Sequence, residues 1–294
     1  MDNMKQKTIA ILGLGWLGFP LAKALLACGY KVKGSVTSSE KISKLEGAGI
    51  ELSVVKLYDE YIEYSDARFF NADILFINFP PKRVKGIESI YPNQVKHLLP
   101  LIQQYGISKV VFVSSTSVYN ETNGVVTEDD ELRPEKPSGI ACLNAENVLR
   151  QSDQFATTVI RFGGLIGADR NPHRFMKRSV KNGPAEMPVN LIHLDDCIGI
   201  VQHILENKIW NEVINGCCPV HPVRKEFYQT AAKIAGLELP QFDNKPDFKF
   251  KRVSSERLTN QFGYHFKYQS PVDYLKSLDY LQDSFKSPGE SISK

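Results

Sequence analysis

Three glycines with a fixed spacing form the first candidate site of the chain. Gly13, Gly15 and Gly18 stand in the order G-x-G-x-x-G, between an apolar, strand-like run and a helical pattern. In a strand–turn–helix, the first glycine allows the tight turn, the second lets the backbone approach a diphosphate, and the third lets helix and strand pack closely. The helix N-terminus then faces the phosphates. The loop, with Trp16 and Leu17, predicts a dinucleotide-binding site; the alternative is a glycine-rich turn that binds nothing.

The end of the next strand-like run indicates which dinucleotide fits. A NAD site usually has Asp or Glu at this position to bind the ribose 2′-hydroxyl. Here the run ends in Val36, Thr37 and Ser38, while Glu40 comes late and Lys41 follows it. Small hydroxyl groups backed by a lysine suit a 2′-phosphate, so the sequence favours NADP over NAD. Alternatively, these residues only cap the following helix.

Two further groups of residues could contact a substrate. His221 and Arg224 flank prolines in the segment CCPVHPVRKEF, and Arg174 follows another proline in NPHRF. Guanidinium groups bind carboxylate or phosphate bidentately, so these residues favour an anionic substrate, unless they pair with carboxylates of the chain itself. His193 precedes two aspartates, and we expect it either near the nicotinamide or as a strand histidine before a helix with an aspartate cap.

The elements that must position these residues alternate between strand and helix. Strand-like runs at 8–12, 31–36, 73–78, 109–114 and 157–162 are separated by amphipathic stretches that include 19–28, 91–105 and 143–151. This alternation predicts an α/β fold with a Rossmann-type, doubly wound parallel sheet and a small C-terminal substrate lobe. We expect the NAD(P)-binding domain over 1–168, with 190–215 returning to it. The substrate-binding lobe is expected over 169–189 and 216–288, and a disordered tail over 289–294.

Composition narrows the function classes. The chain has 294 residues, is 42% hydrophobic and carries a net charge of +3, with its basic residues scattered. We therefore expect a small-molecule substrate and neither nucleic acid nor a membrane as partner. The five cysteines form no C-x-x-C pair and show no metal-like spacing with the six histidines. These features predict a cytoplasmic protein with reduced thiols and without a metal. They leave open whether it is a monomer or a homodimer.

Several later segments resemble the extended short-chain dehydrogenase/reductases, the NAD-dependent epimerase/dehydratase family. The similar segments are KVVFVSSTSVY (109–119), VIRFGGLIG (159–167), NLIHLDDCIGIV (190–201) and RVSSERLTNQFGYHFKY (252–268), in the family's order. The glycine loop by itself also resembles β-hydroxyacid dehydrogenases, but the Pro- and aromatic-rich C-terminus does not. The resemblance implies that the substrate is often a nucleotide sugar and that further residues line the cofactor groove. These are Phe79, Pro80 and Pro81 on the adenosine side, and Ser114, Ser115, Gly163, Gly164 and Leu165 beside the nicotinamide.

The chain departs from this family at its catalytic pair. In the family's Tyr-x-x-x-Lys, the tyrosine exchanges a proton with a substrate hydroxyl while hydride moves to or from the nicotinamide. The lysine lowers the pKa of that tyrosine. In EKPSGIACLNAENVL, Ser138 takes the tyrosine position and Cys142 the lysine position, while Gly139 and Glu146 keep the frame. Gln94 replaces a helical asparagine. The resemblance thus leads to the atypical branch of the family.

The acid–base chemistry then has few candidates. Ser115 and Thr116 remain at the family's Ser/Thr position, and Tyr119 is either a surrogate acid or part of the scaffold. Cys142 is either a nucleophile or, with no histidine near it in sequence, a buried thiol. Arg161, within a core strand, is expected to be structural. The chain is therefore predicted to be an NAD(P)-dependent oxidoreductase or epimerase-like enzyme. The alternatives are a dinucleotide-binding sensor or scaffold with little turnover, and a β-hydroxyacid-type dehydrogenase.

Overall fold

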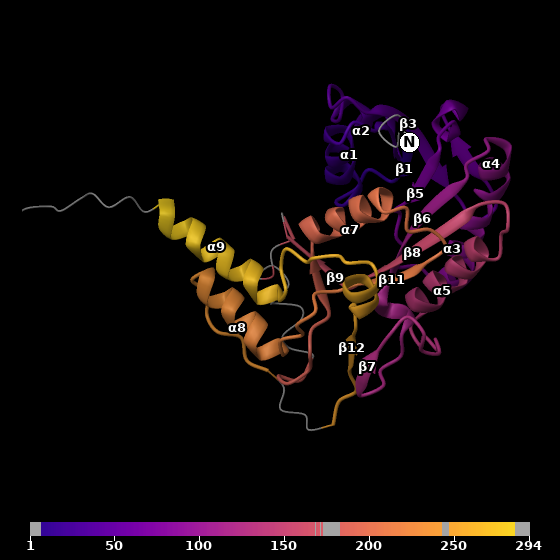
Figure 1. The fold of residues 1–294 in the computed structure, drawn as a ribbon. Helices are drawn as coiled ribbons and strands as arrows, with labels where there is room; N and C mark the ends of the chain where they lie inside the picture. Colours follow the sequence, from indigo (N-terminus) through magenta and orange to yellow (C-terminus); the bar gives the residue numbers. More distant parts are fainter. Residues whose placement is uncertain (1–6, 168, 171, 173–182, 243–246, 286–294) are drawn as a thin grey trace, which may run out of the picture.

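The computed structural model describes residues 7–167, 169–170, 172, 183–242 and 247–285 (Figure 1). Its main sheet has eight strands within these residues, in the order β11-β8-β6-β5-β1-β2-β3-β4. Neighbouring strands pair in parallel, except that β4 runs antiparallel to β3. The bounds are β1 Thr8–Leu12, β2 Lys31–Val36, β3 Glu51–Leu57, β4 Ile62–Tyr64, β5 Ile74–Ile77, β6 Lys109–Ser115, β8 Ala156–Phe162 and β11 Val213–Gly216. The predicted α/β class with a parallel sheet is confirmed.

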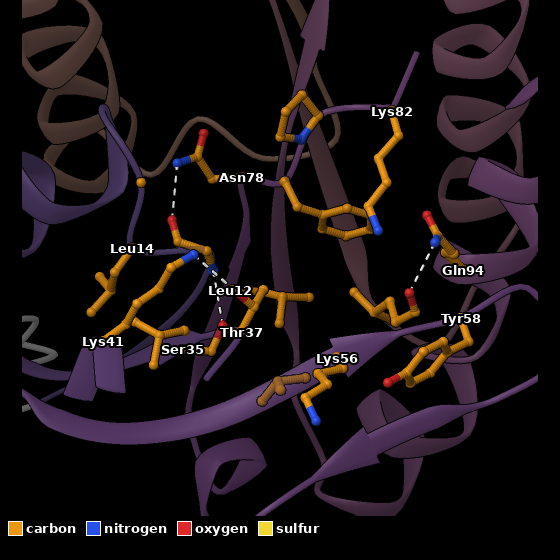
Figure 2. Close-up of a pocket in the computed structure, with 17 residues that line it drawn as sticks. Leu12, Leu14, Ser35, Thr37, Lys41, Lys56, Tyr58, Asn78, Lys82 and Gln94 are labelled. Atoms are coloured by element: carbon orange, nitrogen blue, oxygen red, sulfur yellow. Dashed lines mark hydrogen bonds between the residues drawn. The ribbon is translucent and has the colours of Figure 1, made fainter. Parts of the chain in front are cut away.

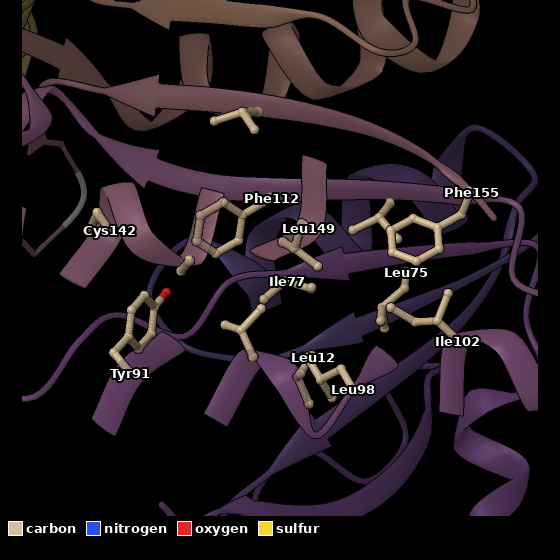
Figure 3. Packing of buried hydrophobic residues seen from close by; sticks show 14 of the residues in the cluster. Leu12, Leu75, Ile77, Tyr91, Leu98, Ile102, Phe112, Cys142, Leu149 and Phe155 are labelled. Atoms are coloured by element: carbon tan, nitrogen blue, oxygen red, sulfur yellow. The ribbon is translucent and has the colours of Figure 1, made fainter. Parts of the chain in front are cut away.

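Two sets of helices cover the two faces of this sheet. Helices α1 (Gly18–Ala27) and α7 (Leu194–Glu206) pack on the face that receives Ile9 and Ile11 of β1. Helices α3 (Ile87–Lys96), α4 (Leu99–Gln104) and α5 (Pro137–Arg150) cover the other face. There they pack on the alternate residues of β1, Ala10 and Leu12. Figure 3 shows part of this second layer, where Leu75, Ile77 and Phe112 of neighbouring strands lie against the helices. Burial on both faces explains the nearly continuous apolar runs of the central strands.

The observed elements differ from the predicted ones in the helix over 91–105 and in three main-sheet strands that were not predicted, β3, β4 and β11. The stretch 91–105 is not one helix, because α3 ends at Lys96 and α4 begins at Leu99. Pro100 lies in the first turn of α4, where its missing N–H costs nothing, whereas inside a continuous helix it would remove a hydrogen bond. Strand β3 was not predicted, although its burial alternates along much of its length.

Smaller elements complete the fold outside the main sheet, and two of them, α8 (Arg224–Ile234) and α9 (Pro271–Phe285), form a second, smaller hydrophobic core. Strand β9 (Gly164–Ile166) pairs with β10 (Leu191–His193), and β7 (Gly124–Val126) pairs with β12 (Lys251–Val253). Helices α8 and α9 lie side by side away from the main sheet in Figure 1. Short helical segments complete the described chain: α2 Ser39–Ser43, 3-10 turns at Ala67–Phe70 and Thr116–Val118, and a π-helical turn at Arg257–Gln261. In the described part of the chain, no helix has the length and apolarity to cross a bilayer.

Segment 190–215 contributes β10 and α7, and α7 packs on the main sheet beside α1. The second core joins Phe227 of α8 to Val272 and Leu275 of α9. The boundaries of the two predicted domains stay a prediction, and the predicted tail over 289–294 lies outside the described residues.

Candidate dinucleotide site

A cavity of about 450 Å³ opens at the carboxyl ends of β1, β2, β3 and β5 (Figure 2). Along the chain, β1 is followed by β2 on one side of the sheet, and β5 then pairs with β1 on the other side. This reversal of strand order is where open α/β sheets bind their ligands. Several residues predicted to bind the cofactor line the cavity together: Gly13, Gly15, Thr37, Lys41, Phe79 and Pro80.

The three loop glycines meet different surroundings. A Cβ added to Gly18 would lie 2.1 Å from the carbonyl oxygen of Gly13, so helix α1 touches the loop backbone at this point. Gly13 has φ of +111°, and a Cβ there would lie 3.1 Å from the carbonyl oxygen of Asn78. A Cβ on Gly15 would meet nothing within 4 Å. Two glycines therefore serve close packing, and the third leaves open space in the wall of the cavity, as a diphosphate requires.

Hydrogen bonds fix this loop to the neighbouring strand ends. The amide of Gly13 donates to Ser35 Oγ at 3.0 Å, and that of Leu14 to the Ser35 carbonyl at 2.8 Å. From the other side, Asn78 Nδ2 donates to the Gly13 carbonyl at 3.2 Å. The loop is thus held between β2 and the end of β5 in a defined shape.

The N-terminus of helix α1 suits an anion. Leu17 occupies the N-cap without a side-chain hydrogen bond, and the first turn contains no acidic residue. The amide of Phe19 already donates to the Gly15 carbonyl at 3.1 Å and Pro20 has no N–H, so it is chiefly the positive end of the helix dipole that favours a negatively charged ligand. Trp16 adds a buried indole N–H that has no hydrogen-bond partner among the described residues. A buried donor without an acceptor costs about 1–3 kcal/mol, and a phosphate oxygen is a suitable acceptor.

The adenosine end of the cavity is basic. Lys41 Nζ donates to Thr37 Oγ1 at 2.9 Å, which places the ammonium group at the end of β2 (Figure 2). Ser38 occupies the N-cap of α2, but its hydroxyl makes no capping hydrogen bond. Ser38 does not line the cavity. Among the described lining residues there is no Asp or Glu to bind a ribose 2′-hydroxyl. The donor set therefore fits a phosphorylated ribose.

Phe79 is held in the cavity wall by its neighbour on α3. Tyr91 donates its hydroxyl to the Phe79 carbonyl at 2.7 Å, and the two ring centroids lie 5.1 Å apart. Pro80 also lines the cavity, whereas Pro81 does not.

Sequence analysis did not identify several lining residues as cofactor contacts: Lys56, Tyr58, Lys82 and Gln94. Lys56 and Tyr58 lie at the end of β3, beside the end of β2, and Lys56 pairs with Glu63 at 2.8 Å. Gln94 was noted only because it stands where the family has an asparagine. Its side-chain amide donates to the carbonyl of Leu57 at 2.9 Å (Figure 2). The alternating run ELSVVKL was a signal that could have found the first two, because a parallel strand next to β2 must end at the same edge.

The residues predicted beside the nicotinamide lie outside this cavity. Ser114 is buried and donates its hydroxyl to Glu146, so this hydroxyl is committed to the interior. Ser115 accepts a hydrogen bond from the amide of Ser117 at 3.1 Å, and Thr116 is buried in the following 3-10 turn. In the segment 163–165, Gly163 packs tightly, since an added Cβ would lie 2.8 Å from the Asn190 carbonyl oxygen, whereas Gly164 is exposed and Leu165 half-buried.

Tyr119 does not fit the role of a surrogate acid. Its hydroxyl donates to Asn215 at 2.8 Å and accepts from Arg161 at 2.8 Å, inside a buried network. Arg161 also forms an ion pair with Glu146 at 2.7 Å, and both side chains are almost fully buried. Burial raises the pKa of Tyr119. The tyrosine therefore belongs to the scaffold, and Arg161 is structural, as the sequence analysis expected.

The residues at the family's catalytic pair carry no acid–base function in this geometry. Ser138 is exposed at the start of α5. Cys142 is buried one turn further on, and burial, with the nearby Glu146 carboxylate, raises the pKa of its thiol to about 12. A thiol that stays protonated is a poor nucleophile, so Cys142 fits the alternative of a buried helical residue. Gly139 keeps α5 close, because a Cβ there would lie 2.3 Å from the carbonyl oxygen of Ser117.

His193 lies in the interior, and the predicted aspartate cap of α7 is wrong. The residue at the N-cap is His193 itself, whose Nδ1 accepts from the amide of Asp195 at 3.1 Å. Its ring packs against Tyr268 and Tyr274 with centroids 4.6 and 4.2 Å away. Burial lowers the pKa of His193, so the imidazole is neutral at pH 7 and accepts at Nδ1.

The remaining predicted substrate residues lie around the second core. His221 Nδ1 lies 3.3 Å from the carbonyl of Val189, and burial lowers the pKa of this histidine. Arg224 begins α8 with its guanidinium 5.5 Å from the centre of the Tyr228 ring. Neither residue lines the dinucleotide cavity. Arg174 lies outside the described residues.

Comparison with known proteins agrees with this geometry. The model of a family described as NAD(P)H-binding matches residues 13–189. The chain is 34% identical over 270 residues to Protein YeeZ of Escherichia coli K12, covering 90% of this chain and 98% of that one. A short-chain dehydrogenase/reductase superfamily protein from Agrobacterium tumefaciens with bound NAD has a TM-score of 0.75 at 18% identity, covering 95% and 98% of the two chains.

A second solved structure with the same fold is UDP-N-acetylglucosamine 4-epimerase from Bacillus cereus, with a TM-score of 0.75 at 15% identity, covering 95% of this chain and 100% of that one. These structures share the Rossmann-type fold, and the resemblance to extended short-chain dehydrogenase/reductases is confirmed. The chain is a member of the NAD(P)H-binding family with the fold of the NAD-dependent epimerases and dehydratases.

Proposed function

We propose that the protein is a NADP-preferring oxidoreductase of the epimerase/dehydratase type, acting on a small anionic or nucleotide-sugar-like substrate. The observation that carries the cofactor preference is the pair Lys41–Thr37 at the end of β2, joined by a hydrogen bond of 2.9 Å in the wall of the cavity. An ammonium group and a hydroxyl both donate hydrogen bonds, which a phosphate accepts. Lys82 lines the same cavity and adds positive charge, whereas the charge of Lys56 is paired with Glu63.

The glycine loop would hold the diphosphate and the basic end of the cavity the adenosine ribose. A bound nicotinamide supplies hydride transfer. The chain then has to bind the substrate, orient its oxygen and exclude water. Ser115 fits the orienting role best among the predicted residues, because its oxygen accepts from Ser117 N and its own proton has no acceptor among the described residues.

For proton transfer, none of the predicted residues is a strong acid–base candidate. Tyr119 is occupied by Arg161 and Asn215, and Cys142 stays protonated, so neither replaces the family's tyrosine. A serine hydroxyl is a weak base when no cation lowers its pKa. We therefore expect slower turnover than in relatives that keep the Tyr-x-x-x-Lys pair.

The proposal of an anionic, sugar-like substrate rests on two features. His221 and Arg224 lie close together in the chain at the start of α8, and a guanidinium group binds carboxylate or phosphate well. The Bacillus cereus protein with the same fold acts, by its name, on a UDP-linked sugar.

The test is a fluorescence titration of the protein with NADPH and NADH side by side. We expect NADPH to bind at least about tenfold more tightly, which equals about 1.4 kcal/mol. Lys41→Ala should remove most of this preference. Lys44→Ala, which changes an exposed lysine at the C-cap of the same helix α2, is the matched control and should keep it.

A preference for NADH would overturn the NADP assignment, and absence of binding of both would overturn the proposed function. If NADPH binds, its oxidation is then followed with keto sugars and UDP-linked keto sugars as substrates. Binding without turnover on any of them would favour a dinucleotide-binding protein over an enzyme.

A further inference from the structure

A second cation lies against the glycine loop and comes from a distant part of the chain. Arg170 follows β9, and its amide donates to the Gly167 carbonyl at 2.9 Å. The centre of its guanidinium group lies 4.3 Å from the centroid of the Trp16 ring. Trp16 stands between Gly15, which leaves open space in the cavity wall, and the first turn of α1. Neither Trp16 nor Arg170 lines the cavity, but Trp16 directly follows Gly15, which does, so the arginine stacks on the residue next to the cavity wall.

The guanidinium group of Arg170 carries an unneutralised charge. Among the described residues it has no carboxylate partner and no hydrogen-bond acceptor, and its contact is the stack on Trp16. Some other arginines are paired with carboxylates, such as Arg161 with Glu146 and Arg257 with Asp129. Stacking uses the face of the guanidinium plane and leaves its in-plane N–H groups available. Such a group is suited to bind an anion.

We infer that Arg170 binds the diphosphate of the dinucleotide, on the side opposite the backbone N–H groups of the loop. The inference rests on the proposed function, because it names a further residue of the same binding site. Loop amides and the α1 N-terminus supply partial positive charges, whereas Arg170 supplies a full charge and a planar fork that matches two phosphate oxygens. Trp16 positions this fork, which explains an aromatic side chain in the loop.

A diphosphate bound to Arg170 would also contact two parts of the chain. The glycine loop belongs to the first strand–helix unit, and Arg170 belongs to the segment that leads from β9 towards the second core. A diphosphate bound by both would tie Arg170 to the glycine loop.

The experiment compares ligands that contain a diphosphate with one that does not. NADPH and ADP-ribose carry the diphosphate, and 2′-AMP carries only the phosphate at the ribose 2′-position. For Arg170→Ala, we expect the affinities of NADPH and ADP-ribose, measured by calorimetry, to fall about tenfold or more, since a charge-assisted hydrogen bond is lost. The affinity of 2′-AMP should stay within about twofold of the unchanged protein. Arg170→Lys, which keeps the charge but loses the fork, should lie between the two.

The matched control is Lys23→Ala. Lys23 is a cation on helix α1 itself, with its ammonium group 5.9 Å from the Phe19 ring. It should leave all three affinities unchanged. Fluorescence of Trp16, measured in a Trp210→Phe background that leaves it as the single tryptophan, should change on binding of ADP-ribose.

Two results would overturn the inference while the proposed function stands. One is NADPH binding by Arg170→Ala with unchanged affinity. The other is an equal loss for 2′-AMP and ADP-ribose, which would mean that the arginine only supports the fold. If the unchanged protein binds none of these ligands, the proposed function itself fails, and the two failures are thereby distinguished.

Discussion

Gly15→Ala separates binding from folding in this protein. Gly15 lies outside the left-handed region, and an added Cβ would meet no heavy atom within 4 Å. The folded chain therefore accepts alanine without strain. Since alanine has less freedom than glycine in the unfolded chain, the substitution should stabilise the protein by about 0.4–1 kcal/mol. The melting temperature should stay the same or rise by up to about 3 °C.

The same methyl group enters the space into which a diphosphate would fit. The phosphates must then move away from the loop amides, and hydrogen bonds weaken steeply with distance. Loss of one charge-assisted hydrogen bond costs about 1.5–3 kcal/mol, which weakens binding roughly 10- to 100-fold. We therefore expect a stable protein that binds NADPH poorly.

The assay combines thermal unfolding with a NADPH titration on the same preparation. Gly18→Ala is the matched comparison, because its Cβ would lie 2.1 Å from the Gly13 carbonyl oxygen. That variant should lose about 1–3 kcal/mol of stability or more through overpacking. Gly15→Ala with undiminished NADPH affinity would refute the placement of the diphosphate, and a large loss of stability in it would refute the reading of the loop as open at this point.

Three further predictions concern the interior. Glu146→Ala leaves the charge of Arg161 buried without its carboxylate partner, so urea unfolding should show a loss of about 3–5 kcal/mol; a loss below 1 kcal/mol would contradict this. Burial lowers the pKa of His193 and of His221 below the ordinary 6.5, so the folded state binds fewer protons than the unfolded one. Stability should therefore fall as the pH drops from 7.5 towards 5, and a melting temperature that rises instead would argue against it. Iodoacetamide at pH 8 should modify Cys28 alone, since the other thiols are buried; mass spectrometry would detect a second site.

The sequence predicted the parts of the site that are local in the chain. The glycine loop is an example, because Gly13 and Gly18 are five residues apart and their packing follows from one strand–turn–helix. Thr37 comes just before Ser38, the N-cap of α2, and Lys41 lies in the first turn of that helix, so their hydrogen bond joins residues that are close in the chain. Such contacts depend on short-range geometry, and the pattern of residue types is sufficient to predict them.

Contacts between side chains far apart in the chain could not be predicted from the sequence. The sequence left open whether Tyr119 is a surrogate acid or part of the scaffold, because its partners Arg161 and Asn215 are 42 and 96 residues further along the chain. The stack of Arg170 on Trp16 joins residues from separate strand–helix units in the same way. Periodicity gives the face of an element that is buried, but not which side chain of another element it meets there.

Helix α5 shows why fold and chemistry separate in this chain. Glu146 is fixed by the buried charge of Arg161 and by the hydroxyl of Ser114, so its replacement would strongly destabilise the protein. Ser138 is exposed on the same helix, so the fold can accept other residues at this position. The residues that hold this helix in place can thus be retained because the fold needs them, while the residues at the proton-transfer positions change. An intact Rossmann core is therefore evidence for a bound dinucleotide, and the rate of any reaction must be measured separately.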